Sequence, residues 1–289
     1  MISLGVHAFC VARDWNPREW RALLPGLVGQ GVSVIEVPLL RPEEMEAEAS
    51  RALAEEYGME LVCSLGLPGR LDPVEDPGSA LAFLAGALEV AARAGANALS
   101  GVTYGTIGKT SGAPPTAREL DGIARYLVRA AAEAKARGLR LGIEPCNRYE
   151  THLMNSGAEA RAMIERVGAD NLFIHVDTYH MAIEEAGFEQ GFRDCGPFLG
   201  YVHASESNRG VPGRGMIDWD AVFAGLAAAG YCGPVTLESF VFVDQDIARG
   251  LALWRPVAER PKAVIAEGLP FLREVAERHG LVWDRAAAI

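Results

Sequence analysis

Short apolar runs alternate with longer amphipathic segments along the whole chain, and a glycine precedes nearly every run. Runs such as VSVIEVP and MELVCSLG are short, contain several β-branched residues and do not alternate strictly in polarity. This pattern predicts strands that are covered on both faces. A glycine just past a helix end takes the left-handed conformation that closes the last turn. The glycines expected to do this are Gly31, Gly58, Gly95, Gly138, Gly168, Gly200 and Gly230.

The segments between the apolar runs carry helix-start signals. Asn16-Pro17 and Arg41-Pro42 place proline at a first helical position, and Ser156 with Glu159 matches a capping box. Counting SLGVHAF as the first strand gives eight strand–helix units without a linker rich in proline or serine. Eight such units predict an α/β fold of the (β/α)₈ TIM barrel class, with residues 1–289 as a single catalytic domain. An open doubly wound sheet is the alternative, although no glycine-rich dinucleotide fingerprint follows an early strand.

Composition and charge narrow the class of protein further. The chain has 289 residues, of which 49% are hydrophobic, and a formal net charge of -11. A surface that binds nucleic acid needs a basic face, so this charge argues against such a partner. The five cysteines are scattered without a C-x-x-C pair, which indicates neither a disulfide framework nor a thiolate zinc site. We therefore expect a cytoplasmic protein with reduced thiols and no membrane segment.

Four successive apolar runs end in, or carry, groups that bind metals. Glu144 follows RLGI, Asp177 closes FIHVD, His203 lies in GYVHAS, and Glu238 closes VTLE. Because the active sites of TIM barrels lie at the carboxyl ends of the strands, we expect these four side chains on one rim. A single acidic residue at a strand end is commonly a helix cap. A rim of unrelated charged residues is thus the alternative interpretation.

Three carboxylates that converge without an intervening Lys or Arg repel one another, by about 4 kcal/mol per pair at about 4 Å. A cation among them is therefore expected. Three oxygen donors and one imidazole suit a divalent metal, Mn²⁺ foremost, with Co²⁺ or Mg²⁺ as alternatives. Glu144 and Glu238 come from strands separated by two others. They would flank a ligand on opposite faces, which fits proton removal from one side of a carbon and return from the other.

Further polar groups follow the same strands. Glu150 lies in NRYET, His180 lies just beyond Asp177, and Arg209 lies in ESNRGVPGRG. Each alone is commonly a surface residue. Together on neighbouring loops of one face they predict binding of sugar hydroxyls.

At these residues the chain resembles the ketose 3-epimerases, the family of D-tagatose 3-epimerase and D-psicose (allulose) 3-epimerase within the xylose-isomerase-like barrels. The matching stretches are EPCNRYETHLMN, VDTYHMAIEE, HASESNRGVPGRGMIDW, GYCGPVTLESF and LWRP. The resemblance spans nearly the whole chain and is densest from residue 140 onward. It implies an isomerase that inverts C3 of free ketoses such as D-tagatose, D-fructose or D-psicose, and L-ribulose. It also implies a homodimer or homotetramer, and residues 241–261 are a candidate interface or lid.

The resemblance also implies roles for individual residues. The implied metal ligands are Glu144, Asp177, His203 and Glu238, and the implied acid/base pair is Glu144 and Glu238. Glu150, His180 and Arg209 would bind the O1 to O3 end of the ketose. With O2 and O3 chelated by the metal, one glutamate would take the C3 proton to give a cis-enediolate. The other glutamate would protonate the opposite face.

Some positions depart from the family pattern. His7 stands where relatives usually carry an aromatic residue, and Ile107 stands where some carry tryptophan. We expect both to line the pocket with Trp15, Ser64 and Phe240. The preferred sugar does not follow from these changes. We interpret His175, two residues before Asp177, as a hydrogen-bonded core histidine rather than a fifth ligand.

Other functions share this fold. An aldose–ketose isomerase of the hydroxypyruvate or rhamnose isomerase type would use the same metal and transfer a proton between C1 and C2. An inosose-type dehydratase would release water. A DNA-repair nuclease would need more histidine ligands and a basic groove, which six histidines and a net charge of -11 disfavour. A non-enzymatic sugar-binding or metal-binding barrel is the remaining alternative.

Overall fold

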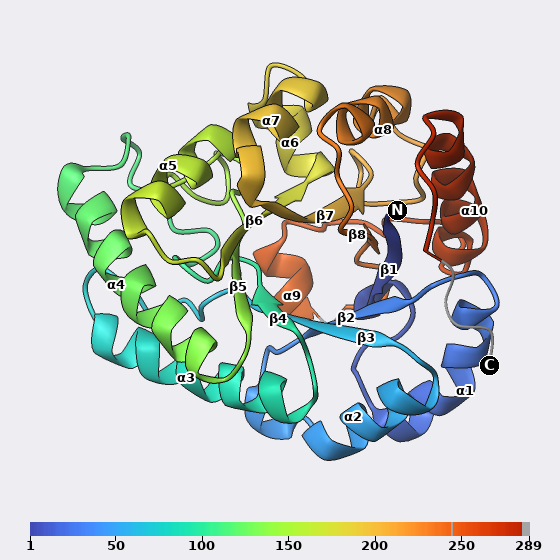
Figure 1. Ribbon diagram of the computed structural model, residues 1–289, viewed down its shortest axis with the longest axis horizontal. Helices are drawn as coiled ribbons and strands as arrows, with labels where there is room; N and C mark the ends of the chain where they lie inside the picture. Colours follow the sequence, from blue (N-terminus) through green and yellow to red (C-terminus); the bar gives the residue numbers. More distant parts are fainter. Residues whose placement is uncertain (244, 285–289) are drawn as a thin grey trace.

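Eight parallel strands close into a barrel in the computed structural model, which describes residues 1–243 and 245–284 (Figure 1). Each strand is hydrogen-bonded to the next in chain order, and the last strand pairs with the first. The strands are β1 Ser3–His7, β2 Val34–Pro38, β3 Glu60–Ser64, β4 Ala98–Ser100, β5 Arg140–Ile143, β6 Leu172–Asp177, β7 Leu199–Ser205 and β8 Pro234–Glu238. The predicted (β/α)₈ barrel is therefore confirmed.

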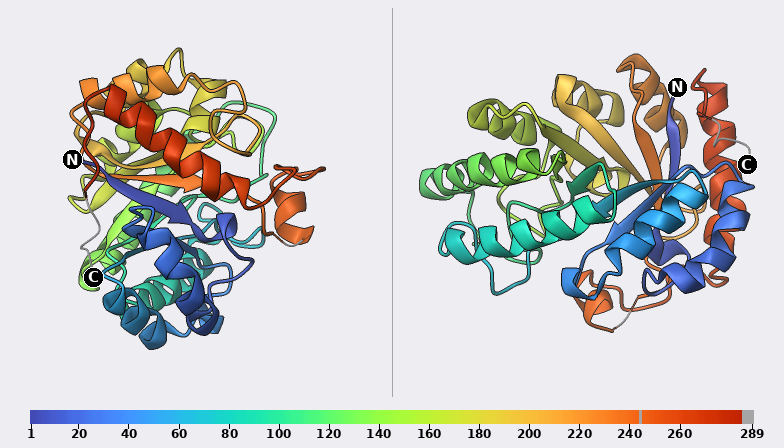
Figure 2. Two further views of the ribbon diagram at one scale, coloured as in Figure 1. Left: turned by 90° about the vertical axis from the view of Figure 1, so that its right-hand side faces the viewer. Right: turned by 60° about the horizontal axis from the view of Figure 1, so that its bottom comes forward.

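The α-helices surround the barrel on the outside (Figure 2). Their bounds are α1 Pro17–Val28, α2 Ala47–Glu56, α3 Pro77–Arg93, α4 Ala117–Ala136, α5 Gly157–Val167, α6 Thr178–Glu184, α7 Phe188–Cys195, α8 Trp219–Ala228, α9 Gln245–Gly250 and α10 Ala263–Arg278. Three short 3₁₀ helices are η1 Ala8–Cys10, η2 Pro42–Glu44 and η3 Gly196–Phe198. The first and last described residues of the chain lie close together, since the backbone N–H of Asp284 donates to the oxygen of Ile2, and α9 lies at the opposite end of the barrel from the N-terminus (Figure 2).

Most helix boundaries follow the predicted signals. Ser156 and Glu159 form the capping box of α5, and every predicted glycine except Gly200 has a positive φ. Gly200 lies inside β7, and Gly196, with φ of 58°, ends α7 instead. The prediction at Pro42 was also imprecise, because this proline starts the 3₁₀ helix η2 and α2 begins only at Ala47.

The barrel interior has an apolar layer and a polar layer. An apolar cluster fills the interior near the amino ends of the strands, and consists of Val34, Val62, Ala98, Phe173 and Tyr201. Strand side chains alternate between faces with a period of two. The residues two positions further along the same strands, among them Glu36, His175 and His203, therefore face the same interior one layer higher. This upper layer is the floor of the candidate site.

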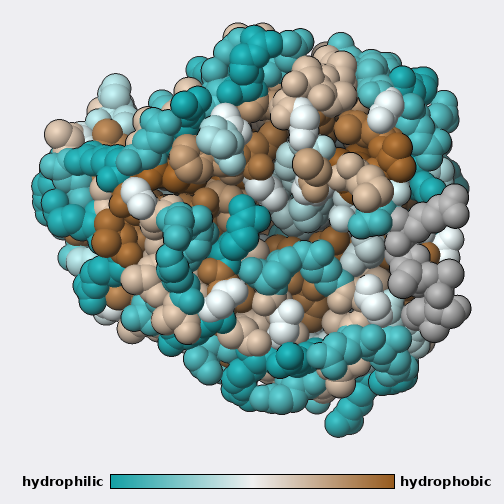
Figure 3. Space-filling model, in the orientation of Figure 1, coloured by the Kyte–Doolittle hydropathy of each residue, from teal (hydrophilic) through white to brown (hydrophobic). Residues whose placement is uncertain are grey.

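The outer surface of the barrel is polar at its rim. The end at which the N-terminus lies shows hydrophilic residues along the outer helices and hydrophobic residues nearer the centre (Figure 3). Among the described residues, none of the helices combines the length and apolarity that crossing a membrane requires. All five cysteines are free thiols, as expected from their spacing.

A substitution of Gly142 on β5 tests how tightly the barrel interior is packed. A Cβ atom there would lie 2.7 Å from Cζ of Phe173 and closer still to Oγ of Ser100. We expect Gly142→Ala to lower the free energy of unfolding by about 1–3 kcal/mol through overpacking. The control, Gly86→Ala in α3, meets no atom within 4 Å and should stabilise the protein by up to about 1 kcal/mol. Denaturant unfolding measures both, and equal effects of the two substitutions would contradict the packing described here.

Candidate active site

A cavity of about 270 Å³ opens at the carboxyl ends of the strands. Most of the residues predicted for the site line it, namely His7, Ser64, Ile107, Glu144, Glu150, His180, His203, Arg209, Glu238 and Phe240. Asp177 lies just beneath this lining and is 1% exposed. Trp15, contrary to the prediction, lies outside the cavity. Its indole Nε1 donates a hydrogen bond to Oγ of Ser50 on α2, and its ring packs against Trp20 of α1.

Four consecutive strands bring the acidic groups and His203 together. Asp177 and Glu238 are the last residues of β6 and β8, Glu144 directly follows β5, and His203 lies inside β7. Nδ1 of His203 is 3.2 Å from Oε1 of Glu238, 3.7 Å from Oδ2 of Asp177 and 4.0 Å from Oε1 of Glu144. The convergence that the strand ends suggested is therefore present in the structure.

The ring of His203 is held in one orientation from behind. Its Nε2–H donates a 2.6 Å hydrogen bond to Oε2 of Glu36. Its Nδ1 is buried and has no hydrogen-bond partner within the part of the chain that the structure describes. A buried nitrogen without a partner is costly unless something else binds it. When the ring is neutral, Nδ1 therefore carries a lone pair directed toward the space among the carboxylates.

Arg209 also reaches into this group of carboxylates. Its Nη1 donates to Oδ2 of Asp177 at 2.7 Å, to Oε2 of Glu238 at 2.6 Å and to Oγ of Ser205 at 2.9 Å. The premise that no Lys or Arg lies among the carboxylates is thus wrong. The guanidinium stacks 3.9 Å over the ring of Tyr179, which holds it at the mouth of the barrel.

The negative charge of the three carboxylates still exceeds the positive charge of Arg209. Three carboxylates and one guanidinium sum to a formal charge of -2, which one divalent cation would balance. Burial raises the pKa of Glu144 to about 8 and raises the pKa of Glu238 well above its usual range. Burial acts in the same direction on Asp177, but Arg209 and His203 outweigh it and hold the pKa of Asp177 well below its usual range. The three acids are thus hard to ionise together without another cation.

The geometry suits a divalent ion. Two ligand atoms bound at about 2.1 Å to one octahedral ion lie about 3 Å apart when adjacent and about 4 Å apart when opposite. The separations of 3.2–4.0 Å between Nδ1 of His203 and the carboxylate oxygens fall in this range. Three oxygens and one imidazole nitrogen form a set that Mn²⁺, Co²⁺ or Mg²⁺ accepts.

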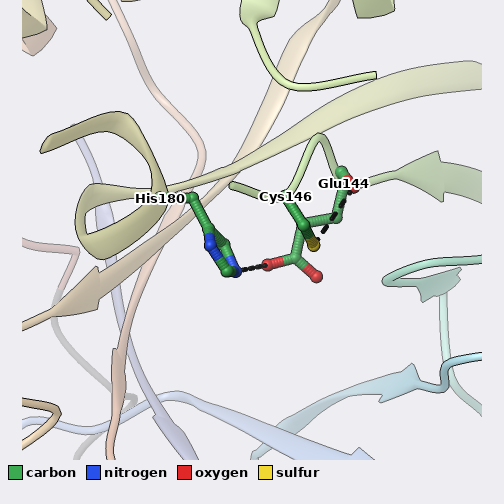
Figure 4. Close-up of side chains that lie close together, drawn as sticks. All are labelled: Glu144, Cys146 and His180. Carbon is green, nitrogen blue, oxygen red and sulfur yellow. Dashed lines mark hydrogen bonds and ion pairs between the residues drawn. The ribbon is translucent and has the colours of Figure 1, made fainter. Parts of the chain in front are cut away.

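A second group of close side chains consists of Glu144, Cys146 and His180 (Figure 4). Nδ1 of His180 receives the backbone N–H of Asn147 at 3.2 Å and lies 2.8 Å from its side-chain Nδ2. A ring nitrogen that receives a backbone N–H must be the acceptor, so the hydrogen of neutral His180 is on Nε2. This nitrogen therefore faces Glu144 as a donor and cannot bind a metal in this state. The thiol of Cys146 points to the backbone oxygen of Glu144.

Asn147 links two of the predicted sugar-binding residues. Its Nδ2 donates to Oε1 of Glu150 at 3.0 Å and also approaches His180. The Nε2–H of His180 lies 3.9 Å from Oε1 of Glu144 and 3.4 Å from Nη2 of Arg209. Two N–H donors and one carboxylate thus converge beside the cavity. Such a set can bind hydroxyl or carbonyl oxygens of a small polar ligand.

The rest of the cavity wall is apolar. Leu40, Leu65 and Leu67 line one part of it, and Ile247 and Leu251 line another. The latter two belong to residues 241–261, which we expected to form an interface or a lid, and α9 lies in this segment. Residue 244 of this segment lies outside the described residues.

Sequence reasoning missed two buried groups at the site. Glu36 was counted only as part of the apolar run VSVIEVP, although a charged residue inside such a run is rarely buried without a partner. Asn147 lies in EPCNRYE and carried no signal of its own. His175 is fully buried, and its Nδ1 lies 3.0 Å from Oγ of Ser100 and 3.8 Å from Oε2 of Glu144. Its interpretation as a core histidine stays a prediction.

We expect the ring hydrogen of His180 to be on Nε2, because Nδ1 accepts the N–H of Asn147. Burial lowers the pKa of His180, so the ring should be neutral at pH 7. Long-range ¹H–¹⁵N correlation spectra distinguish the two tautomers, and a His180→Gln variant assigns the signal. Asn147→Ala should increase the Nδ1–H form, because it removes the side-chain donor. An Nδ1–H tautomer in the unmodified protein would contradict this arrangement.

Comparisons with known proteins extend over nearly the whole chain. The sequence pattern of the family described as "Xylose isomerase-like TIM barrel" matches residues 29–275. The L-ribulose 3-epimerase of Methylomonas sp. (strain DH-1) is 33% identical over 279 residues, which cover 94% of this chain and 97% of that protein. The ketose 3-epimerase of Arthrobacter globiformis is 36% identical, over 94% of this chain and 96% of that protein.

A solved structure is also similar over nearly the whole chain. The crystal structure of a D-allulose 3-epimerase from Methylomonas sp. in complex with D-allulose superposes with a TM-score of 0.88. The two chains are 33% identical, and the superposition covers 94% of this chain and 96% of that chain. The similarity thus includes the strands that carry the site as well as the helices around them.

Proposed function

We propose that this protein inverts C3 of free ketoses. The chain belongs to the xylose isomerase-like TIM barrel family and, within it, to the ketose 3-epimerases, which are isomerases. The observation that carries this proposal is the convergence of Glu144 and Glu238 on His203 from strands separated by β6 and β7. Two carboxylates that approach one space from different strands can serve opposite faces of one carbon. The residues around them supply donors for a polar ligand.

The substrate class rests on the relatives. Proteins similar over nearly the whole chain act on L-ribulose and on ketoses, and one was crystallised with D-allulose. We propose that L-ribulose, D-tagatose and the D-fructose/D-psicose pair are substrates here too. A cavity of about 270 Å³ lies near the lower end of the range of ligand pockets, about 300–1,000 Å³, which suits a small ligand such as a free sugar.

A divalent metal, with Mn²⁺ as the first candidate, completes this proposal. Glu144, Asp177, His203 and Glu238 would hold it, because their donor atoms converge and carry a charge that a dication balances. When bound, such an ion polarises a carbonyl and stabilises negative charge that develops on neighbouring oxygens.

In this proposal, Glu144 and Glu238 transfer the proton at C3 of the ketose. A proton next to a carbonyl is too weakly acidic for an unaided carboxylate, so the negative charge of the enediolate must be stabilised by its surroundings. One glutamate removes the C3 proton and the other returns a proton to the opposite face. Arg209 and the Nε2–H of His180 face the same space and would hold the O1 to O3 end, with Glu150.

The rival on the same barrel is an aldose–ketose isomerase. Incubation of the purified protein with each ketose in deuterated water separates the two activities. We expect a C3 epimer that carries one deuterium at C3, read by NMR. An aldose product labelled at C2, or no exchange at C3 with any of the four ketoses, would contradict the proposal.

Removing either glutamate tests its role directly. Glu144→Gln and Glu238→Gln should each reduce kcat by about 10²–10⁴-fold, because general acid–base groups contribute about that much. Glu274→Gln is the matched control, since this side chain is exposed on α10. Mn²⁺ binding is measured on the same variants, so that a lost base is distinguished from a lost ligand. If either active-site variant kept a kcat within about twofold of that of the unmodified protein, the acid/base assignment would be wrong.

Metal removal tests the cofactor. Dialysis against a chelator should abolish exchange at C3 and lower the thermal unfolding temperature. Readdition of Mn²⁺ at about 100 times its Kd should restore about 2.7 kcal/mol of stability through binding to the folded state. His203→Gln should lose this response. If none of Mn²⁺, Co²⁺ and Mg²⁺ raised the thermal unfolding temperature, the result would contradict the proposed metal site.

Two further aspects stay predictions. We propose that residues 1–289 act as one catalytic domain, because both halves of the barrel contribute to the site through β1 and β8. The homodimer or homotetramer implied by the family resemblance is testable by light scattering on the purified protein.

A further inference from the structure

Glu36 is a buried acidic residue that the proposed chemistry does not use. It lies in the middle of β2, points into the barrel and is 1% exposed. Ionised side chains are rarely buried to this extent unless they are paired. Its position at the floor of the cavity, behind His203, indicates a role in the site.

The donors in the hydrogen bonds around Glu36 all point toward its carboxylate. The Tyr201 hydroxyl donates to Oε2 of Glu36 at 2.9 Å, and Oγ1 of Thr236 donates to the Tyr201 hydroxyl at 2.7 Å. The same Oε2 receives the Nε2–H of His203 at 2.6 Å. A carboxylate can only accept hydrogen bonds. The hydrogen of neutral His203 is therefore on Nε2 and its lone pair is on Nδ1.

The other oxygen of Glu36 faces a second imidazole. Nε2 of His7 lies 3.6 Å from Oε1 of Glu36, too far for a hydrogen bond, while Nδ1 of His7 accepts the backbone N–H of Phe9. Oε1 has no hydrogen-bond partner among the described residues. The strong contact of this carboxylate is thus to His203 and not to His7.

We propose that Glu36 is a positioning residue that makes His203 a metal ligand, an inference that rests on the proposed function. It holds the ring so that Nδ1 faces Asp177, Glu144 and Glu238, and it keeps the hydrogen on the far nitrogen. A carboxylate behind a histidine also increases the basicity of the coordinating nitrogen. In this role Glu36 acts on the ion through His203, to which its Oε2 is bonded, and is not itself a ligand.

The test is the affinity of the metal-free protein for Mn²⁺, measured by calorimetry or by EPR of free Mn²⁺. Glu36→Gln keeps the shape and an oxygen acceptor but loses the charge. We expect its Kd to rise about 10–100-fold, the usual effect of changing a group behind a metal ligand. Tyr201→Phe is the matched control, because it removes another hydrogen bond to the same oxygen without touching His203. Its Kd should stay within about threefold of that of the unmodified protein.

A double-mutant cycle shows whether Glu36 acts through His203. In a His203→Gln background, Glu36→Gln should change the remaining Mn²⁺ affinity by less than about twofold, because the ring it orients is gone. A merely structural role would reduce the affinity in both backgrounds. Circular dichroism of the metal-free variants checks folding. If Glu36→Gln does not fold, Glu36→Asp, which keeps the charge but retracts it from His203, gives the same readout.

The outcomes separate this inference from the proposed function. A Kd of Glu36→Gln within about twofold of that of the unmodified protein, or an equal loss in both backgrounds, would overturn the role of Glu36 alone. An unmodified protein that binds none of Mn²⁺, Co²⁺ and Mg²⁺ would overturn the metal site and this inference with it. A loss confined to the background that contains His203 would support both.

Discussion

The mutual repulsion of Glu144, Asp177 and Glu238 is the constraint on which the rest of the site depends. Two carboxylates about 4 Å apart repel by about 4 kcal/mol even with an effective dielectric constant near 20. Arg209 relieves part of this, because its guanidinium bonds two of the three carboxylates. The remaining formal charge of -2 and the orphan Nδ1 of His203 call for a dication at the same point. Burial and geometry thus support the divalent cation that we propose at this point.

The barrel makes this arrangement possible because its interior is layered. An apolar layer below closes the core, and its Tyr201 donates a hydrogen bond to Glu36, which accepts from His203 in the polar layer above. Asp177 on β6 pairs with His203 on β7, and Glu238 on β8 pairs with Ser205, two residues further along β7. The loop after β7 then supplies Arg209, and α6, which directly follows β6, supplies His180. The strand ends therefore hold the proposed metal ligands, and the segments that follow them hold the groups proposed to contact a ligand.

The barrel and the four converging groups could be predicted from the sequence, because the apolar runs of β5, β6 and β8 close on Glu144, Asp177 and Glu238 and that of β7 contains His203. Arg209 was expected at this face, but its contact with Asp177 and Glu238 could not be predicted, since it depends on how the loop after β7 folds back. Buried Glu206 holds that loop by accepting from Trp219 Nε1 and from the backbone of Gly213. Trp15 was misplaced for a similar reason, because its partner Ser50 is remote in sequence. A pattern along one strand cannot show contacts between elements.

The central claim is that one divalent ion is shared by Glu144, Asp177, His203 and Glu238. Anomalous diffraction from crystals grown with Mn²⁺, recorded at an energy where manganese scatters anomalously, tests it most directly. The account predicts a single strong peak within bonding distance of all four side chains. A map without a peak there, with the guanidinium of Arg209 filling the space among the carboxylates, would contradict it.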